Sequence, residues 1–477
     1  MGGPQVAHDV LGGAARARYA NDEAARTALL DHPFTRFAFV AMGQGRVLDK
    51  LAGASKATAP TEGVAAPGRF TLDNGLAVRI RPIPGASRLA LLVLYKVGGD
   101  HDPRGRSGLA HLAEHLYVTA AAGEVPARTA EAFFRGYPDG CNAQTGDRYT
   151  VIATVFPGQD LEKELREAAA RMADLRITAA DIDRERPRLL DEVANMFGRI
   201  PALGAVNLAR ERIRPTPEGG RKGGLPEDVA AITVDEIRTH WRRYYKPRNA
   251  ILVLAGAVDE GAASRAVADH FAKLPPGEEA PGPADPRAPQ AGVVRESAVP
   301  VFRSQSAPVA CVAYAAPDPG TEQYAPFLVL AARFWAASGR PGAGGEAGRP
   351  TVYFPLLEDP AMLGVSATAR PGETPEQAIG RLESFVADAV APPLRDDERA
   401  SARRTFAMFL GTAEIPDVAL AQNPYGVALA LARREQLGVD PAALGRAFDS
   451  LTERDLRLAA EIFAPGRRVG VWLTHAE

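Results

Sequence analysis

Two histidines and a glutamate lie within five positions of one another in the segment SGLAHLAEHLYV, residues 107–118. If this segment is helical, His111 and His115 lie on one face, so both imidazoles can bind the same ion. Glu114 would be close enough to contact a water molecule on that ion. A catalytic zinc site needs such a set, together with a third protein ligand and an open position for water.

A second segment offers the missing ligand. Residues 181–197, DIDRERPRLLDEVANMF, are predicted to form an amphipathic helix. Glu185 and Glu192 lie two turns apart on it and differ by only about 20° in direction, so both can face one pocket. We expect Glu192, beside Leu190 and Val193, to be the more buried, and Glu185 to orient a ligand histidine. The alternative is that both acids, and the two histidines, are ordinary surface residues of amphipathic helices.

Composition excludes several classes of function. The formal net charge of -2 gives no electrostatic surface for nucleic acid or an anionic membrane. Cys141 and Cys311 are the only cysteines, so a metal must be bound by His, Asp and Glu. The apolar stretches are too short to span a bilayer, and the N-terminus has no secretory signal. We therefore expect a cytoplasmic protein without nucleic-acid or membrane partners.

The 477 residues are enough for two to four domains, and changes in composition and hydrophobic pattern divide them into four parts. Residues 1–68 are predicted to be an N-terminal extension that carries no chemistry. Residues 69–274 combine antiparallel strands with grouped helices, which indicates an α+β domain. Residues 275–292, dense in proline, glycine and acids, are predicted to be a linker. Residues 293–477 form the last part.

This last part repeats the pattern of the first domain. TVDEIR from Thr233 is echoed by TERDLR from Thr452, and each is followed by an apolar strand. At the repeat offset, the HxxEH positions fall on three apolar residues, Ala325, Leu328 and Val329. We therefore expect two homologous domains, each an antiparallel-rich sheet packed with helices on one face. The second copy is degenerate, so the chain should carry a single metal site.

Together these residues resemble the inverzincins, or pitrilysin-like zinc peptidases, in the half-length, two-domain form related to the mitochondrial processing peptidase. In that family a glutamate ligand follows the second histidine by about 77 residues, and His115 plus 77 is Glu192. A supporting glutamate lies seven residues before the ligand, which is the position of Glu185. The family's substrate-facing edge strand carries an Asn-Ala-x-Thr motif, which begins here at Asn142 and Ala143.

The resemblance implies a zinc-dependent endopeptidase with one zinc ion per chain, held by His111, His115 and Glu192. By the same resemblance, Glu114 acts as the general base toward a zinc-activated water. The edge strand that contains Asn142 would bind short, extended or unfolded peptides, including precursor or leader peptides, as an added strand.

One feature of the family is not matched. Active members place an Arg and, seven residues later, a Tyr in the second domain, where they hold the substrate carbonyl. Arg340, Arg349 and Tyr353 occur in this region, but without that spacing. We therefore expect a dimer, with a homologous, non-identical partner chain that supplies the Arg/Tyr pair. The alternative is a non-catalytic scaffold subunit, although such subunits typically lose the motif residues that persist here.

Overall fold

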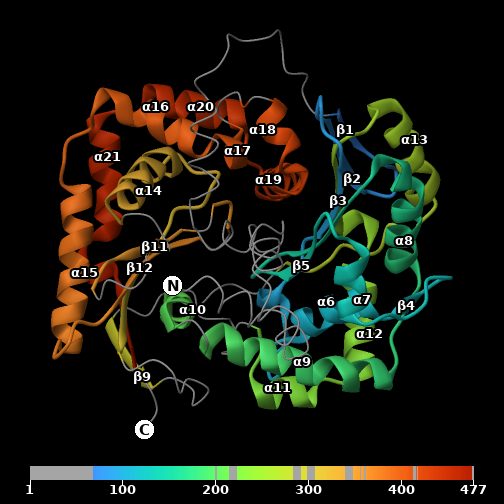
Figure 1. The fold of residues 1–477 in the computed structure, drawn as a ribbon, viewed down its shortest axis with the longest axis horizontal. Helices are drawn as coiled ribbons and strands as arrows, with labels where there is room; N and C mark the ends of the chain where they lie inside the picture. Colours follow the sequence, from blue (N-terminus) through green and yellow to red (C-terminus); the bar gives the residue numbers. More distant parts are fainter. Residues whose placement is uncertain are drawn as a thin grey trace, which may run out of the picture.

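The computed structural model describes residues 68–474, apart from residues 199–200, 214–222, 283–291, 298–306, 339–347, 355, 359–360, 412–414 and 416. The predicted N-terminal extension, residues 1–68, lies outside this range except for its last residue, and so does much of the predicted linker. The described residues form two halves, each built on its own sheet, which face one another across the molecule (Figure 1).

The first sheet has six strands in the order β1-β2-β8-β3-β6-β5. Its strands are β1 (Gly68–Thr71), β2 (Ala77–Pro82), β3 (Leu89–Tyr95), β5 (Cys141–Thr145), β6 (Thr150–Phe156) and β8 (Ala250–Gly256). All neighbours are antiparallel except β2 and β8. The central strands β3 and β8 are buried along their whole length, whereas β5 forms an edge. A separate short pair joins β4 (Ala121–Ala122) to β7 (Leu175–Arg176).

The second sheet has the order β11-β12-β10-β13-β9. Its strands are β9 (Gly292–Ser297), β10 (Val309–Ala315), β11 (Thr351–Tyr353), β12 (Met362–Thr368) and β13 (Val469–Thr474). Only β13 and β9 are parallel. Read from its short edge strand, this order reproduces the first sheet from β5 to β2, including the position of the single parallel pair. The predicted duplication of an antiparallel-rich α+β domain is therefore present in the topology.

Helices surround both sheets. Those of the first half are α6 (Leu109–Thr119), α7 (Ala130–Gly136), α8 (Leu161–Ala173), α9 (Ala179–Gly198), α10 (Pro201–Ile213), α11 (Pro226–Ala231), α12 (Val234–Tyr244) and α13 (Glu260–Phe271). Those of the second half are α14 (Tyr324–Ser338), α15 (Pro375–Val390), α16 (Asp396–Thr405), α17 (Ala407–Leu410), α18 (Asp417–Ala421), α19 (Pro424–Leu437), α20 (Pro441–Ser450) and α21 (Glu453–Ala460).

The repeated segments occupy matching places in the two halves. The helices α12 and α21 begin with the same capping box, in which Thr233 or Thr452 caps the helix and the residue three positions later caps it back. The helix α14 follows β10 as α6 follows β3, and its residues Ala325, Leu328 and Val329 are fully buried apolar side chains. The helix of the second copy therefore serves the core and carries no metal ligand at these positions.

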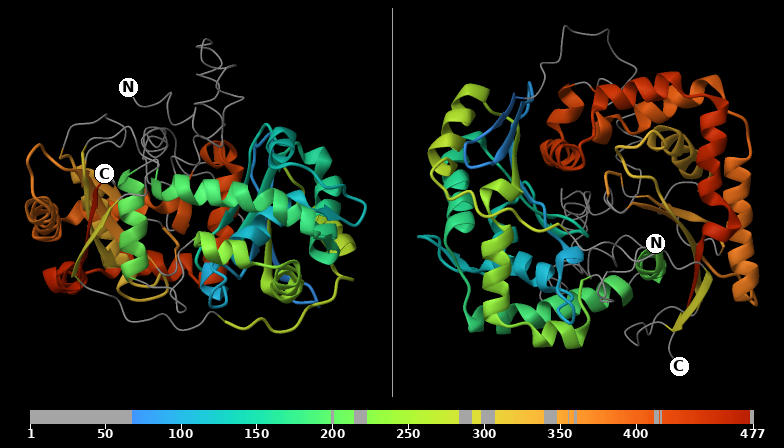
Figure 2. Two further views of the ribbon diagram at one scale, coloured as in Figure 1. Left: turned by 90° about the horizontal axis from the view of Figure 1, so that it is seen from below. Right: turned by 180° about the vertical axis from the view of Figure 1, so that it is seen from behind.

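Each half also lends one helix to the other (Figures 1 and 2). The helix α10 of the first half packs on the second sheet, where Val206 and Ala209 share a core with Val471 of β13. The helix α19 of the second half packs on the first sheet, where Leu431 shares a core with Leu92 of β3. Helices on one face of each sheet were predicted; the opposite face is covered by a helix from the other half. Neither half buries its sheet alone.

The helix α6, which carries the candidate site, is packed closely by its neighbours. It packs against α9, α12 and the edge strand β5, and most of its side chains are buried. The Asp102 carboxylate accepts hydrogen bonds from the backbone N–H groups of Gly108 and Ala110, both at 2.8 Å, and so satisfies donors at the helix N-terminus. Gly108 has a φ of 90°, and the Cβ atom of any other residue at this position would lie 2.9 Å from the backbone oxygen of Gly223. Glycine is therefore required there.

No helix in the described ranges combines the length and the apolar character that a membrane span requires.

Candidate metal centre

The predicted ligands converge at one point between α6 and α9. His111 and His115 lie one turn apart on α6, with ring centroids 4.9 Å apart and planes at 84°. Glu192 on α9 brings Oε1 to 3.9 Å from His111 Nε2 and Oε2 to 3.4 Å from His115 Nε2. One ligand atom from each residue lies within 4.8 Å of the others, and the described residues hold no second cluster of this kind.

The donor set and its spacing fit zinc. Bonds of about 2.0–2.1 Å in a tetrahedral arrangement put ligand atoms about 3.3–3.5 Å apart. The contact of 3.4 Å between Glu192 and His115 meets this value, and the 3.9 Å contact of Glu192 with His111 is only slightly longer. Two imidazoles and one carboxylate also form the three-ligand set of a catalytic site, which leaves a position open for water.

The second ring nitrogen of each histidine is held by a protein oxygen. His111 Nδ1 lies 3.3 Å from the backbone oxygen of Gly223. His115 Nδ1 lies 3.6 Å from Glu185 Oε2. These contacts orient both rings so that the Nε2 atoms point to the shared centre, as is usual for metal-binding histidines.

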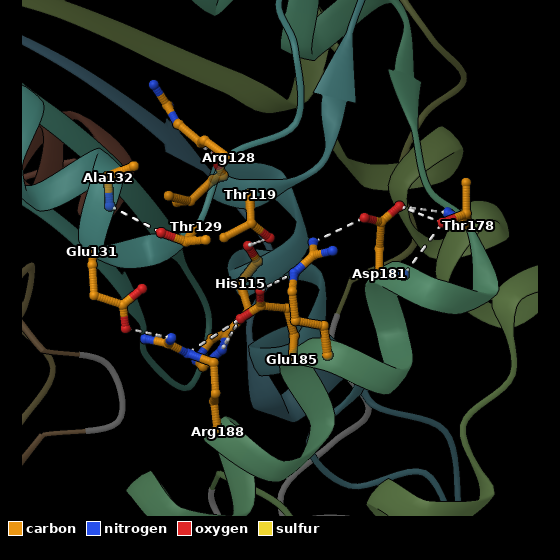
Figure 3. Close-up of polar contacts among 12 residues, drawn as sticks. His115, Thr119, Arg128, Thr129, Glu131, Ala132, Thr178, Asp181, Glu185 and Arg188 are labelled. Carbon is orange, nitrogen blue, oxygen red and sulfur yellow. Dashed lines mark hydrogen bonds and ion pairs between the residues drawn. The ribbon is translucent and has the colours of Figure 1, made fainter. Parts of the chain in front are cut away.

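Glu185 is itself fixed by two arginines on its own helix (Figure 3). Its Oε1 accepts a hydrogen bond from Arg184 Nε at 3.1 Å, and its Oε2 lies 3.5 Å from Arg188 Nε. Arg188 then reaches Glu131, at the start of α7, at 2.6 Å. Burial raises the pKa of Glu185, but its close contact with His115 and its hydrogen bond from Arg184 outweigh this effect and lower it, so the carboxylate stays ionised.

The expected burial of the two glutamates is wrong. The side chain of Glu185 is 1% exposed, whereas that of Glu192 is 53% exposed. Glu185 is covered because it lies against His115, between α6 and α9. Glu192 faces the open side of the centre, and its sequence neighbour Val193 points about 100° away into the core. Apolar neighbours in sequence therefore did not predict which of the two acids is buried.

Glu114 lies in the wall of the centre. It is buried, and its Oε2 accepts a hydrogen bond from Thr145 Oγ1 at 2.8 Å. Burial raises the pKa of Glu114, while the neighbouring charges of His111 and His115 oppose the rise. A raised carboxyl pKa brings the group closer to the range in which it can both accept and return a proton.

The centre as a whole stabilises positive charge. Burial disfavours the charged form of His115, yet its contacts with Glu185 and Glu192 raise its pKa to about 10. Partial loss of solvent between α6 and α9 raises the pKa of Glu192, but its contact with His115 and the charge of His111 lower it to about 2. Three carboxylates around two imidazoles create a negative electrostatic potential that would favour the binding of a cation.

The strand β5 brings the two other predicted residues to the edge of the first sheet, beside α6. Asn142 and Ala143 pair with β6 on one side only, so the outer backbone groups of the strand have no strand partner among the residues that the structure describes. Alternate side chains point to opposite faces: Ala143 packs toward α6 and α7, whereas Asn142 Nδ2 donates to Tyr425 Oη of α19 at 2.9 Å. Tyr425 was not predicted, because nothing in its segment marks it as a partner of the edge strand.

The residues considered for the Arg/Tyr pair do not meet as a pair. Arg349 Nε donates to the backbone oxygen of Ser338 at 3.2 Å, and Tyr353 lies on β11. Arg340 lies outside the described residues. Burial raises the pKa of Tyr353; a different arginine, Arg210 of α10, opposes this rise, whereas the charges of Glu358 and Asp147 add to it.

Comparison with known proteins agrees with the fold. A family profile described as "Peptidase M16 inactive domain" matches residues 231–336. The chain is 26% identical over 210 residues to the zinc protease PqqE of Helicobacter pylori. This alignment covers 43% of this chain and 46% of that protein. A crystal structure of a protease from Helicobacter pylori aligns over 86% of this chain and 99% of its own, with TM-score 0.67 and 20% identity.

The chain is therefore similar to pitrilysin-like M16 zinc proteases in part of its sequence and to M16-like proteins in its fold. The aligned part spans about half the length of the curated relatives it matches. The periplasmic protease PqqL of Escherichia coli has the same fold in one part: it aligns over 88% of this chain but only 48% of its own length, with TM-score 0.66 and 17% identity. The segment that matches the inactive domain begins after Glu192, so that description does not refer to the metal centre.

Proposed function

We propose that this chain is a zinc-dependent endopeptidase of the M16 type that acts on extended or unfolded peptides. The observation that carries the proposal is the convergence of His111, His115 and Glu192 within 4.8 Å, beside the buried carboxylate of Glu114. A structural zinc site would normally have four protein ligands. Three ligands and an adjacent acid support a hydrolytic centre.

Each residue has a distinct part in the proposed reaction. His111, His115 and Glu192 would hold zinc, which when bound supplies a Lewis acid for the scissile carbonyl and for water. Glu114 would take a proton from the attacking water and return it to the leaving amine, since its raised pKa suits both steps. Thr145 keeps the Glu114 carboxylate in one orientation through its hydrogen bond of 2.8 Å.

The edge strand β5 supports the choice of substrate. A peptide that adds to this edge must present its own backbone as a strand, so folded proteins are excluded unless a segment unfolds. Asn142 and Ala143 would bind mainly through backbone groups, which makes recognition tolerant of side chains. Short precursor or leader peptides satisfy this requirement.

A cleavage assay tests the proposal. The purified chain, alone or together with the homologous partner proposed below, should cleave an unfolded peptide, lose activity when a chelator removes the metal, and regain it when zinc is restored. The same sequence constrained within a folded domain should resist cleavage. Activity that survives complete metal removal would contradict the proposal.

The second candidate is a non-catalytic partner subunit, and one observation favours it. The Arg/Tyr pair of active relatives has no match in spacing here, and Arg349 is bound to Ser338. Such a subunit would bind zinc and extended peptides without cleaving them, either alone or with a partner.

We propose further that the chain works as a dimer with a homologous chain that supplies the missing pair. The alignment of this fold with about half of the longer PqqL chain supports such pairing. Light scattering and cleavage measured together test it: full activity in a monomeric preparation would contradict it. A cytoplasmic location stays a prediction, to be tested by cell fractionation, since PqqL is described as periplasmic.

A further inference from the structure

A buried polar cluster joins the two halves next to the edge strand. It surrounds the turn at residues 146–149, which connects β5 to β6 directly after Thr145. Four side chains from elsewhere hold this turn. We call them the clasp: Arg210 of α10, Glu358 after β11, and Arg433 and Gln436 of α19.

Each member of the clasp contacts the turn. Arg210 Nη2 lies 2.8 Å from Asp147 Oδ2. Glu358 Oε1 accepts a hydrogen bond from Tyr149 Oη at 2.8 Å, and the Arg433 guanidinium lies 3.8 Å from the centre of the Tyr149 ring. Gln436 Nε2 donates to the backbone oxygen of residue 148 at 2.8 Å. Three of the four come from the second half of the chain.

Glu358 links the clasp together. Its Oε2 lies 3.7 Å from both Arg210 Nη2 and Arg433 Nη2, so one carboxylate faces two guanidinium groups. The side chains of Glu358 and Arg433 are 13% and 4% exposed. A buried carboxylate between two arginines is costly to leave unpaired, so its position is well defined.

The backbone before Glu358 is strained in a way that fixes this position. Leu357 has φ of 56°, and among the described residues it is the only non-glycine residue with positive φ. A leucine adopts this conformation only when its surroundings impose it. Here the side chain is buried and the backbone oxygen accepts a hydrogen bond from Arg433 Nε at 2.9 Å.

The turn transmits this constraint to the candidate centre. Thr145, the residue directly before the turn, donates a hydrogen bond to Glu114, and Gln144 Nε2 donates to Tyr149 Oη at 3.0 Å. The position of the outer edge of β5 therefore depends on contacts that the second half supplies.

We propose that Glu358 is a positioning residue, through which the second half of the chain holds the turn at 146–149 and so aligns the peptide-binding edge and Glu114. This role rests on the proposed peptidase function. It assigns the degenerate half a task that needs no metal ligand, since it would shape the site that the first half carries.

Amide hydrogen exchange of the full chain tests the proposal without any need for activity. Glu358→Gln removes the two ion pairs, and Tyr149→Phe removes the hydroxyl while keeping the ring beneath Arg433. Both should speed exchange in residues 141–150 by about 2-fold to 30-fold, with β8 unchanged. The matched control is Glu398→Gln, because Glu398 is also 13% exposed and paired with an arginine, Arg333, but lies on α16. It should leave residues 141–150 unchanged.

Peptide cleavage supplies the second measurement. In the two variants, KM for an unfolded peptide should rise by a similar factor, with a smaller change in kcat, since the binding edge is displaced more than the metal ligands. Unchanged exchange at 141–150 in both variants would overturn the proposal, as would an equal increase throughout the chain or in the Glu398→Gln control. A wild-type chain with no cleavage activity, either alone or with its homologous partner, would contradict the peptidase function instead, while the exchange result would still decide the role of Glu358.

Discussion

The Glu185 carboxylate should contribute to metal affinity although it is not a ligand. Its Oε2 lies 3.6 Å from His115 Nδ1 and the side chain is 1% exposed, so it fixes the ring that must present Nε2 to the metal. Glu185→Gln keeps the size of the side chain and removes its charge. Loss of such a supporting group typically lowers metal affinity by about 10–100-fold, or about 1.4–2.7 kcal/mol.

The surroundings of Glu185 place the expected loss in the upper part of this range. Arg184 and Arg188 both face the carboxylate, at 3.1 and 3.5 Å. After the substitution, Arg184 and Arg188 keep Asp181 and Glu131 as partners, but the negative charge that separates both guanidinium groups from His115 is lost. We therefore expect zinc affinity to fall by about 30–100-fold.

Competition with a chromophoric chelator measures this loss directly, with Glu131→Gln as the control. Glu131 also pairs with Arg188, at 2.6 Å, but its side chain is 59% exposed. Removal of an exposed pair should change affinity by less than about fivefold. Equal affinity of Glu185→Gln and wild type would refute the reasoning, and an equal loss in Glu131→Gln would show that Arg188, and not the carboxylate beside His115, supports the ring.

Three further predictions concern stability and the edge strand. Burial lowers the pKa of His240 to about 3, so the imidazole stays neutral in the folded chain but takes up a proton in the unfolded chain as the pH falls below about 6.5. The free energy of unfolding should therefore fall by about 2 kcal/mol between pH 6.5 and pH 5. Urea unfolding at the two pH values should show a smaller difference for His240→Gln, and an unchanged difference would contradict this. Leu92→Ala, beneath α19, should lower the free energy of unfolding by about 2–5 kcal/mol, and a loss below 1 kcal/mol would argue against close packing of the two halves. Tyr425→Phe removes the hydroxyl that accepts from Asn142, so we expect a loss of about 0.5–1.5 kcal/mol in calorimetry and a raised KM for peptides; an unchanged KM would separate Tyr425 from binding.

The sequence alone predicted part of the metal centre on physical grounds. Helical spacing is enough to place His111 and His115 on one face, with Glu114 close to the same point. No such rule joins them to Glu192, which lies on another helix: the helix pattern made it a candidate, and the family spacing identified it as the third ligand. The structure brings these residues together, while their roles stay predictions.

The burial of the acids could not be read from their neighbours in sequence. Glu185 and Glu192 share a helix face, so only the position of α6 decides which of them is covered. The prediction that Glu192 is the more buried was wrong for this reason.

The exchange of helices between the halves was also beyond the sequence. The pattern of duplicated strands predicted two α+β domains, and the strand orders agree. The segments of α10 and α19, however, carry no mark that each belongs on the opposite sheet, because an apolar helix face does not specify its partner. The contacts of Tyr425 and Glu358 with the first half depend on that exchange, so they were missed as well.

The central claim is that Glu114 is the general base of a zinc peptidase, and Glu114→Gln tests it most directly. The substitution keeps the size of the side chain and its contact with Thr145, but it removes the group that accepts the proton. Zinc content and cleavage of an unfolded peptide should be measured on the same preparations of wild type and variant. We predict one zinc per chain in both and a loss of cleavage in the variant of at least about 100-fold. Cleavage by the variant at the wild-type rate, with zinc retained, would contradict the account.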